Sequence, residues 1–328
     1  MAARIRGAPL TSGGTENIFL ALKSARDQAR RRGHLCATPN IVVPASAHPA
    51  FDKAGQYLGL EVIRVPVAAD LRADVQRMEA FVTRNTILIA ASAPSFPYGM
   101  IDPVESLGRI ALHHNLWPHV DACIGAFIAP FLSRQGYDLP AFDFGVPGVG
   151  SISADLHKYG FAPKGISAIL YSDPERHSHQ EFAFEGWQRG RYVTPGFTGT
   201  RPASSIAAAW AVMQFLGFEG YADIARRVVT TRRAIEAGVR DLGLDVVGRP
   251  ELGILAYRAD GLDMADLEAR LEERGWHSGR LIQPAAIHLM ITPAQEPVVD
   301  EYLADVAWAL AAAGSAPPSG RREKVDVY

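Results

Sequence analysis

The sequence lacks the features of several common protein classes. Only two of its 328 residues are cysteines, Cys36 and Cys123, and no Cys/His cluster has the spacing of metal ligands. A disulfide scaffold would need more cysteines, so we expect a reducing compartment and no metal site. No stretch reaches the roughly 18 apolar residues of a membrane span, and the first residues form no apolar signal segment. These absences favour a cytoplasmic protein.

The chain also lacks an excess of charge of either sign. Its 33 basic and 35 acidic residues leave a net charge of −2 at pH 7, so no overall field attracts it to nucleic acid or an anionic membrane. Hydrophobic residues make up 48% and charged residues 21%, which is ordinary for a globular protein. The length allows one large domain and a smaller second one.

Short apolar runs alternate with helical patterns up to about residue 200, which predicts an α/β fold with a mainly parallel sheet. Strands are expected at residues 41–44, 61–65, 86–91, 117–121, 151–154 and 166–171, and helices at 16–32, 51–58 and 103–114. Residues 188–202 read as loop, followed by apolar helices at 204–216 and 221–242 and, near the end, helices at 264–274 and 297–313. We predict a large domain over 1–203, a bridging helix with a small C-terminal α/β domain over 204–314, and a polar tail over 315–328.

One lysine directly follows a predicted strand, between small and aromatic residues. It is Lys158, in the run SADLHKYG of residues 153–160. Partial burial there would lower its pKa, because burial disfavours the charged ammonium, and would leave an amine ready to form an imine. Taken alone, the His-Lys pair is far more typical of a surface lysine that follows a strand.

Three further groups are expected near this lysine. Asp121 ends a predicted strand, and the carboxyl ends of parallel strands meet at one edge of a sheet, where ligands gather. Gly14 and Thr15 open a predicted helix, whose free amides and dipole favour a phosphate. His48 follows another strand and could stack on a flat ring. Each also has a plainer interpretation, as a loop cap, a flexible helix start or a structural histidine.

Six motifs occur in one order along the chain: TSGGTENIFLALKSARD, SAHPAFDKA, SAPSFPYGMIDP, VDACIGAF, SADLHKYGFAPKG and YVTPGFTGTRP. Together they resemble the sphingosine-1-phosphate lyase branch of the pyridoxal-5'-phosphate (PLP) dependent decarboxylase superfamily, from about residue 7 to residue 313. The APKG ending after HKYG separates this branch from ordinary amino-acid decarboxylases. The resemblance implies a PLP-dependent transferase-like fold of type I, with a large domain and a smaller C-terminal one.

The resemblance implies a role for each matching residue. Lys158 would carry PLP as a Schiff base, Asp121 would face the pyridine nitrogen, and His48 would stack over the ring. The residues that would hold the cofactor phosphate are Gly14, Thr15 and His157, joined by Gly199 and Thr200 of the partner subunit, which implies a homodimer with shared active sites.

Two residues would act on the substrate. Tyr98 would assist proton transfer at a substrate hydroxyl, and Lys164 would bind a substrate phosphate as a point charge. The implied reaction is a retro-aldol cleavage of a phosphorylated long-chain amino alcohol, similar to sphingosine 1-phosphate, into phosphoethanolamine and a long-chain aldehyde. The implied partners are this small lipid amine and a second subunit.

Two alternatives stay open from the sequence. A PLP-dependent amino-acid decarboxylase would share the lysine, the aspartate and the stacking histidine, although it has no need of a phosphate-binding cation at Lys164. The chain is also shorter than the family pattern at both ends, since it starts close to the predicted phosphate cradle and stops at Tyr328. A truncated, inactive remnant of the family is therefore the second alternative.

Overall fold

The structure, a computed structural model, describes residues 9–33 and 38–313. The chain forms two compact units, one of residues 1–96 and 100–223 and one of residues 97–99 and 224–328, and the change between them falls inside helix α7 (Ala203–Asp241). The domain limits expected from the sequence stay a prediction. Cys36 and the polar tail expected over 315–328 lie outside the described residues.

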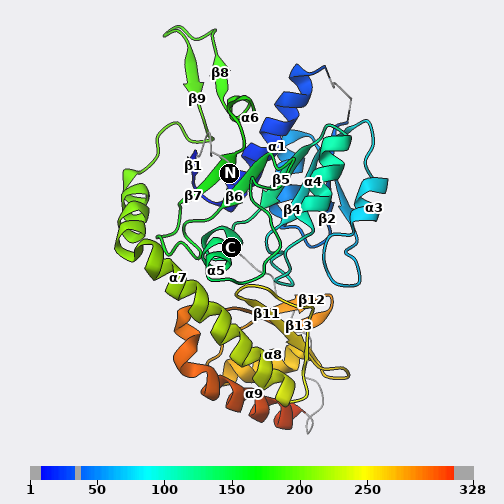
Figure 1. The fold of residues 1–328 in the computed structure, drawn as a ribbon, viewed down its shortest axis with the longest axis vertical. Helices are drawn as coiled ribbons and strands as arrows, with labels where there is room; N and C mark the ends of the chain where they lie inside the picture. The colour runs from blue at the N-terminus through cyan, green and yellow to red at the C-terminus, as the bar shows by residue number, and fades with distance from the viewer. Residues whose placement is uncertain (1–8, 34–37, 314–328) are drawn as a thin grey trace. The chain divides into compact units, whose positions relative to one another are not determined.

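The first unit is built on a seven-stranded sheet (Figure 1). Its strands are β1 (Leu10–Thr11), β2 (Asn40–Pro44), β3 (Glu61–Val65), β4 (Thr86–Ser92), β5 (Trp117–Asp121), β6 (Ser151–Ala154) and β7 (Ser167–Tyr171). They lie in the order β1-β7-β6-β5-β4-β2-β3, and β3, β2, β4, β5 and β6 run parallel. Only β7 and β1 are antiparallel to their neighbours, so the predicted mainly parallel sheet is confirmed.

The central strands are apolar on both faces because helices cover both. All seven residues of β4, with the sequence TILIAAS, are buried, as expected of a strand between two helical layers. Helices α1 (Gly14–Arg31) and α2 (Ala50–Leu58) pack on one face, where their apolar residues share a core with β2 and β4. Helix α4 (Val104–His113) packs against β4 and β5 on the other face (Figure 1).

Several short elements of the first unit were not expected from the sequence. They are the helices α3 (Val75–Ala80), α5 (Ala129–Arg134) and α6 (Pro174–Ser178) and the hairpin strands β8 (Phe182–Phe184) and β9 (Tyr192–Thr194). The prediction of loop throughout 188–202 is therefore wrong at β9, which pairs only with β8. Asp74 and Asp173 accept hydrogen bonds from the first turns of α3 and α6, so their capping role was the missed signal.

The long helix α7 confirms the two helices predicted after residue 203. The backbone at Gly217 has φ 57° and ψ −169°, so the helical path breaks there. Glycine reaches a positive φ without steric strain, which explains why the break falls at this residue.

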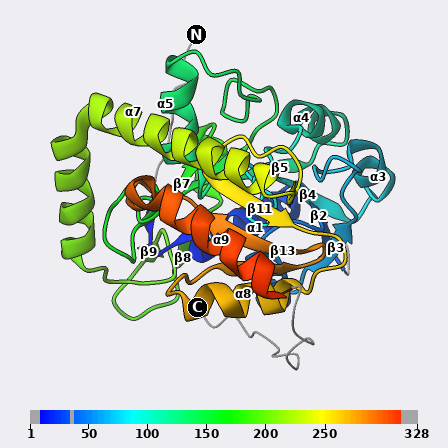
Figure 2. The same ribbon diagram turned by 90° about the horizontal axis from the view of Figure 1, so that it is seen from below.

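The second unit contains a four-stranded antiparallel sheet. Its strands are β10 (Asp245–Val246), β11 (Ile254–Arg258), β12 (Gly279–Ile282) and β13 (Ala285–Met290), in the order β10-β11-β13-β12. Helices α8 (Met264–Glu273) and α9 (Val299–Ala313) cover one face of it (Figure 2), and their apolar residues form one core with the sheet.

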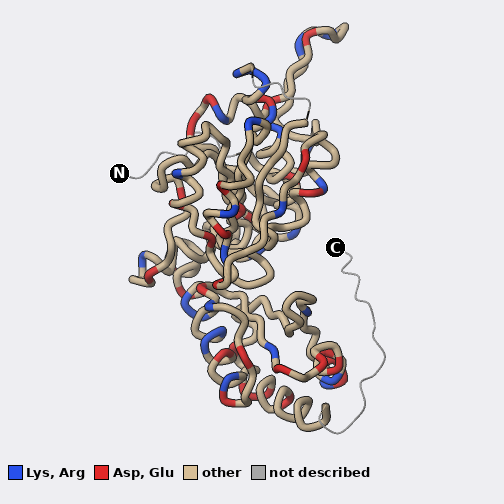
Figure 3. Tube along the Cα trace, turned by 90° about the vertical axis from the view of Figure 1, so that its right-hand side faces the viewer, with Lys and Arg blue, Asp and Glu red and all other residues tan. Residues whose placement is uncertain are grey.

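Acidic and basic residues are mixed along the helices (Figure 3), which agrees with the small net charge of the sequence. Among the described residues, no helix is long and apolar enough to cross a membrane.

Candidate active site

Three segments of the first unit meet at the carboxyl edge of its parallel strands. Asp121 is the last residue of β5, and it pairs in register with Ser153 of the neighbouring strand β6. Lys158 lies in the segment between β6 and β7, and Gly14 begins α1. This edge is where open α/β sheets bind their ligands, so the topology collects residues that lie more than a hundred positions apart.

The amino group of Lys158 forms an ion pair with a buried carboxylate. Its Nζ lies 3.0 Å from Oδ2 of Asp155, and the Asp155 side chain is 1% exposed while that of Lys158 is 29% exposed. Ser167 of β7 donates to Oδ1 of Asp155, and Asn17 of α1 donates to Ser167 Oγ at 2.6 Å. The carboxylate is thus held from a strand and a helix at once.

The charge of Lys158 differs from the sequence-based expectation. Burial acts to lower its pKa, but Cys123, Asp155 and Asp121 act in the opposite direction, and the pKa of Lys158 is raised well above its ordinary value. The expectation of a lowered pKa is therefore wrong. The sequence-based expectation considered burial alone, whereas Cys123, Asp155 and Asp121, which the fold brings near, together outweigh the desolvation of the ammonium.

Asp121 carries a stable negative charge at the end of β5. Burial acts to raise its pKa, but the ammonium of Lys158, a hydrogen bond with Cys123 and the charges of His48 and His119 lower it overall. The backbone N–H of Cys123 donates to Oδ1 of Asp121 at 3.2 Å. The carboxylate therefore stays ionised at neutral pH.

The N-terminus of α1 approaches these groups closely because residue 14 has no side chain. A Cβ atom at Gly14 would lie 2.7 Å from Sγ of Cys123 and 3.1 Å from Oδ2 of Asp155, closer than atoms pack without displacement. No side chain caps the helix at Gly13, so the amides of the first turn, which includes the exposed Thr15, can receive an anion.

Two half-buried histidines border the same place. Nδ1 of His48, in the loop between β2 and α2, accepts from the Ala50 N–H at 3.0 Å, which leaves Nε2 to carry the proton of the neutral ring. Burial lowers the pKa of His48, although Asp121 acts to raise it. His157 has its Nε2 3.7 Å from Oδ2 of Asp155, and burial lowers its pKa as well.

The remaining predicted residues are not gathered around Lys158 in this way. Lys164 is exposed, and its charge contributes to lowering the pKa of His157. Gly199 and Thr200 lie in an exposed loop after β9. Tyr98 belongs to the second unit, where its hydroxyl donates to the Gln283 carbonyl at 3.0 Å. Their roles stay predictions.

Sequence reasoning missed Asp155 and Cys123. Asp155 precedes Lys158 by three positions in SADLHK, a spacing that allows contact within a single turn of chain, so it was a usable signal. Cys123 had no such signal. Its closeness to Gly14 arises from the packing of α1 against the end of β5, and burial raises its pKa well above the ordinary value, so its thiol is neutral.

A fully buried histidine supports Asp121 from within β5. Nδ1 of His119 lies 2.8 Å from Ser151 Oγ and its Nε2 lies 3.1 Å from Ser153 Oγ. Burial lowers the pKa of His119 to about 4, although Asp121 acts to raise it. The imidazole is therefore neutral at physiological pH.

Comparison with known proteins relates this site to one family. The sequence model of the pyridoxal-dependent decarboxylase conserved domain matches residues 7–259. The sphingosine-1-phosphate lyase of Arabidopsis thaliana is 45% identical over 298 residues, which cover 90% of this chain and 55% of that protein. That of Drosophila melanogaster is 43% identical over 301 residues, with the same two coverages of 90% and 55%. The chain thus spans about half the length of the curated relatives it matches.

A solved structure shows the same similarity in three dimensions. The sphingosine-1-phosphate lyase of Burkholderia pseudomallei K96243 superposes with a TM-score of 0.90 at 38% identity. The match covers 93% of this chain and 70% of that chain, so it includes both units described above.

The buried histidine makes stability depend on pH in a defined direction. Because the pKa of His119 is about 4 in the folded chain and about 6.5 in an unfolded chain, the unfolded state binds more protons between these values, and stability falls as the pH falls. Between pH 7 and pH 5, we expect the free energy of unfolding in urea to drop by about 2 kcal/mol more in the wild type than in His119→Gln.

The matched control is His113→Gln at the exposed end of α4, which should retain the wild-type dependence on pH. Equal losses in the wild type and in His119→Gln would contradict the assignment of a neutral, buried imidazole.

Proposed function

The chain belongs to the pyridoxal-dependent decarboxylase family, in its sphingosine-1-phosphate lyase branch, and from this membership we propose that it is a PLP-dependent carbon–carbon lyase. Its substrate would be a phosphorylated long-chain amino alcohol, and its products phosphoethanolamine and a long-chain aldehyde. The observation that carries the proposal is the meeting of Lys158 and Asp121 with an uncapped helix N-terminus at one sheet edge.

The residues at this edge fit the cofactor of the family. The first turn of α1 can receive a phosphate, since no side chain caps the helix, and Gly14 allows this turn to lie close to Cys123 and Asp155. Lys158 would supply the amine for a Schiff base, and the half-buried Asp121 would supply a negative charge for the pyridine nitrogen. When bound, PLP supplies an electron sink through its protonated ring.

The chain's own groups have separate tasks around that ring. Asp121 would face the pyridine nitrogen, and its ionised carboxylate would favour the protonated ring. His48 is kept neutral by burial and would offer a flat face for stacking. His157 and the amides at Gly14 and Thr15 would hold the phosphate.

Two residues would act on the substrate. Lys164 is exposed and so available to bind a substrate phosphate. Burial raises the pKa of Tyr98, so its hydroxyl stays protonated at neutral pH, and it would assist proton transfer as a hydrogen-bonding relay at the substrate hydroxyl next to the bond that breaks, not as the base that takes the proton. Cleavage between the amine-bearing and hydroxyl-bearing carbons requires that hydroxyl to lose its proton.

The lyase is favoured over the amino-acid decarboxylase by the relatives and by one residue. The Arabidopsis and Burkholderia lyases are 45% and 38% identical to this chain. A cation at Lys164 would serve a phosphorylated substrate, whereas an amino-acid decarboxylase has no need of a phosphate-binding cation there.

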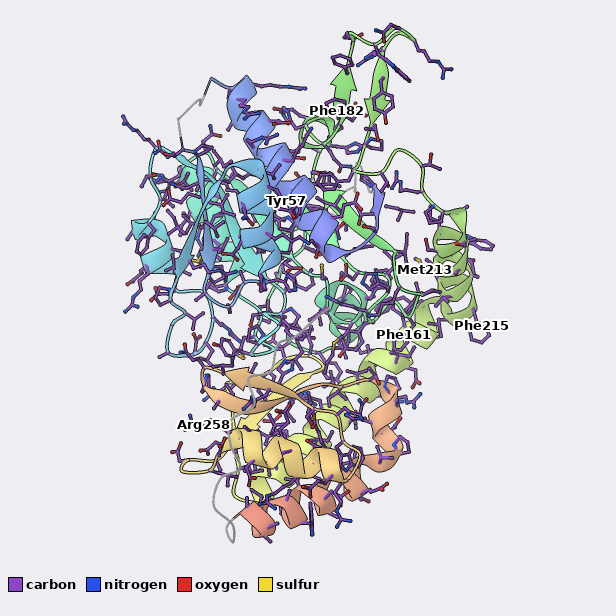
Figure 4. The ribbon with its side chains drawn as sticks, turned by 180° about the vertical axis from the view of Figure 1, so that it is seen from behind. Tyr57, Phe161, Phe182, Met213, Phe215 and Arg258 are labelled. Carbon is purple, nitrogen blue, oxygen red and sulfur yellow. The ribbon has the colours of Figure 1, made fainter. Side chains whose placement is uncertain are left out.

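We also propose that the protein is a homodimer with shared active sites. Large apolar side chains are exposed on the β8–β9 hairpin and on the first part of α7, among them Phe182 at 53%, Trp210 at 65% and Phe215 at 89%. Figure 4 shows Phe182, Met213 and Phe215 at the surface of these elements. A monomer rarely exposes so much apolar surface.

The occupant of this surface would be a second copy of the chain. Gly199 and Thr200 lie between the hairpin and α7 in the sequence, so a copy that covers both elements would also receive this loop. The resemblance assigns these two residues to the phosphate site of the partner subunit, which is the support for shared sites. A cytoplasmic location also stays a prediction.

Lys158→Ala tests the cofactor assignment. The wild type mixed with PLP should develop the visible absorbance of an imine, and borohydride should fix PLP on Lys158 in peptide mass spectra. Lys158→Ala should lose both signals, whereas Lys53→Ala, at an exposed position of α2, should keep them. A reducible adduct at another lysine of the Lys158→Ala variant would overturn the assignment.

Lys164→Ala tests the substrate class. A charge-assisted contact contributes about 1.5–3 kcal/mol, so loss of the cation should raise KM for a phosphorylated sphingoid base roughly ten- to a hundredfold. PLP binding should hardly change, and an unphosphorylated amine should be affected little. If KM rises equally for both substrates, or if an amino acid is decarboxylated faster than either substrate is cleaved, the decarboxylase alternative replaces the lyase.

Hybrid dimers test the shared site. Lys158→Ala and Thr200→Asp should each be inactive, because the second change places a negative charge beside the phosphate. An equimolar mixture that exchanges subunits should recover about a quarter of wild-type activity, since half of the dimers then contain one intact site. Trp210→Glu should give monomers by light scattering. A catalytically competent monomer would contradict the proposal.

A further inference from the structure

The ion pair between Lys158 and Asp155 is unequal in its exposure to water. Lys158 keeps 29% of its side chain exposed, while Asp155 keeps 1%. A buried carboxylate without a partner is strongly unfavourable, so Asp155 depends on the groups that surround it. The 3.0 Å contact with Nζ of Lys158 supplies the nearby positive charge.

The position of the Asp155 carboxylate is fixed from several sides. Oδ1 accepts from Ser167 Oγ, which in turn accepts from Asn17 of α1, and Asn17 Oδ1 accepts from Thr11 Oγ1 at 2.5 Å. Both carboxylate oxygens also lie within 3.2 Å of the place where a Cβ of Gly14 would stand. The hydrogen bond from Ser167 and the contact with Lys158 therefore hold the carboxylate in this position.

We propose that Asp155 is a positioning residue, which pairs with Lys158 before the cofactor binds and keeps its amino group in the charged, unreactive form. The inference rests on the proposed role of Lys158 as the cofactor lysine. An imine forms from a neutral amine and an aldehyde with loss of water, so the ammonium must first release a proton. The ion pair therefore limits how readily Lys158 reacts near neutral pH.

Other titratable groups face Lys158, and they do not replace Asp155. Asp121 at the end of β5 adds a second negative charge. His48 from the β2–α2 loop adds no negative charge, and burial lowers its pKa and so favours the neutral ring. Cys123 is a neutral thiol at physiological pH, since burial raises its pKa. His157 contacts the same carboxylate oxygen at the longer distance of 3.7 Å.

Competitive acetylation of the full chain, freed of PLP, measures the amine directly. The chain has five lysines, Lys23, Lys53, Lys158, Lys164 and Lys324, so peptide mass spectrometry can follow each one over a pH series. Lys53, exposed on α2, normalises the reagent in every sample. In the wild type, Lys158 should titrate above the ordinary lysine value of about 10.4.

Asp155→Asn removes the charge and keeps the shape of the side chain. An opposite charge at this range shifts a pKa by about one to three units, so the titration of Lys158 should move to lower pH and its labelling near neutral pH should rise at least about tenfold. Asp143→Asn is the matched control, because Asp143 is exposed and accepts from the Gly145 N–H, a bond that an asparagine oxygen can keep.

An unchanged titration of Lys158 in Asp155→Asn overturns the inference. If circular dichroism shows that Asp155→Asn does not fold, the acetylation titration of the wild type tests the inference instead. A Lys158 that titrates below the ordinary lysine value in the wild type also overturns the inference. Failure of the proposed function gives a different result, in which PLP and borohydride mark another lysine of the wild type while the acetylation profile of Lys158 is unaffected.

Discussion

The close approach of helix α1 to the ends of β5 and β6 is the constraint on which the rest of the site depends. It is possible because Gly14 has no Cβ, which would lie 2.7 Å from Sγ of Cys123. The approach places the uncapped helix N-terminus beside Asp155, whose carboxylate holds Lys158. A larger residue at position 14 would push the helix away and separate the phosphate cradle from the lysine, so one missing methyl group sets the geometry of both.

Electrostatics in this region differ from those of the chain as a whole. The net charge is only −2, yet two carboxylates, Asp121 and Asp155, act on a single ammonium at the sheet edge. Burial acts to raise the pKa of Asp121 and to lower that of Lys158. Their mutual attraction reverses the outcome for Lys158 and Asp121, so both remain charged at neutral pH. The charged groups that would contact a zwitterionic cofactor are therefore in place before it binds.

The first unit exposes large apolar side chains on part of its surface, although its sheet core is well buried. The β8–β9 hairpin and the first part of α7 expose large apolar side chains, with Phe215 the most exposed at 89%. In the sheet core, by contrast, β4 is buried along its whole length. These exposed apolar side chains, beside a well-buried sheet core, are the observation that supports the proposed dimer.

The sequence by itself determined the mainly parallel sheet and the two helices after residue 203, because periodicity is a local property, and its motifs predicted the roles of Lys158 and Asp121, which stay predictions. It did not reveal the pairing of Asp155 with Lys158 or the contact of Cys123 with α1, and it gave the wrong direction for the pKa of Lys158. The contact of Cys123 with α1 and the action of Asp121 on Lys158 depend on distances between segments far apart in the chain, whereas Asp155 is only three positions from Lys158 and its pairing was a local signal that was missed. Only the tertiary structure decides these long-range effects, because the balance between burial and attraction changes within a few ångströms.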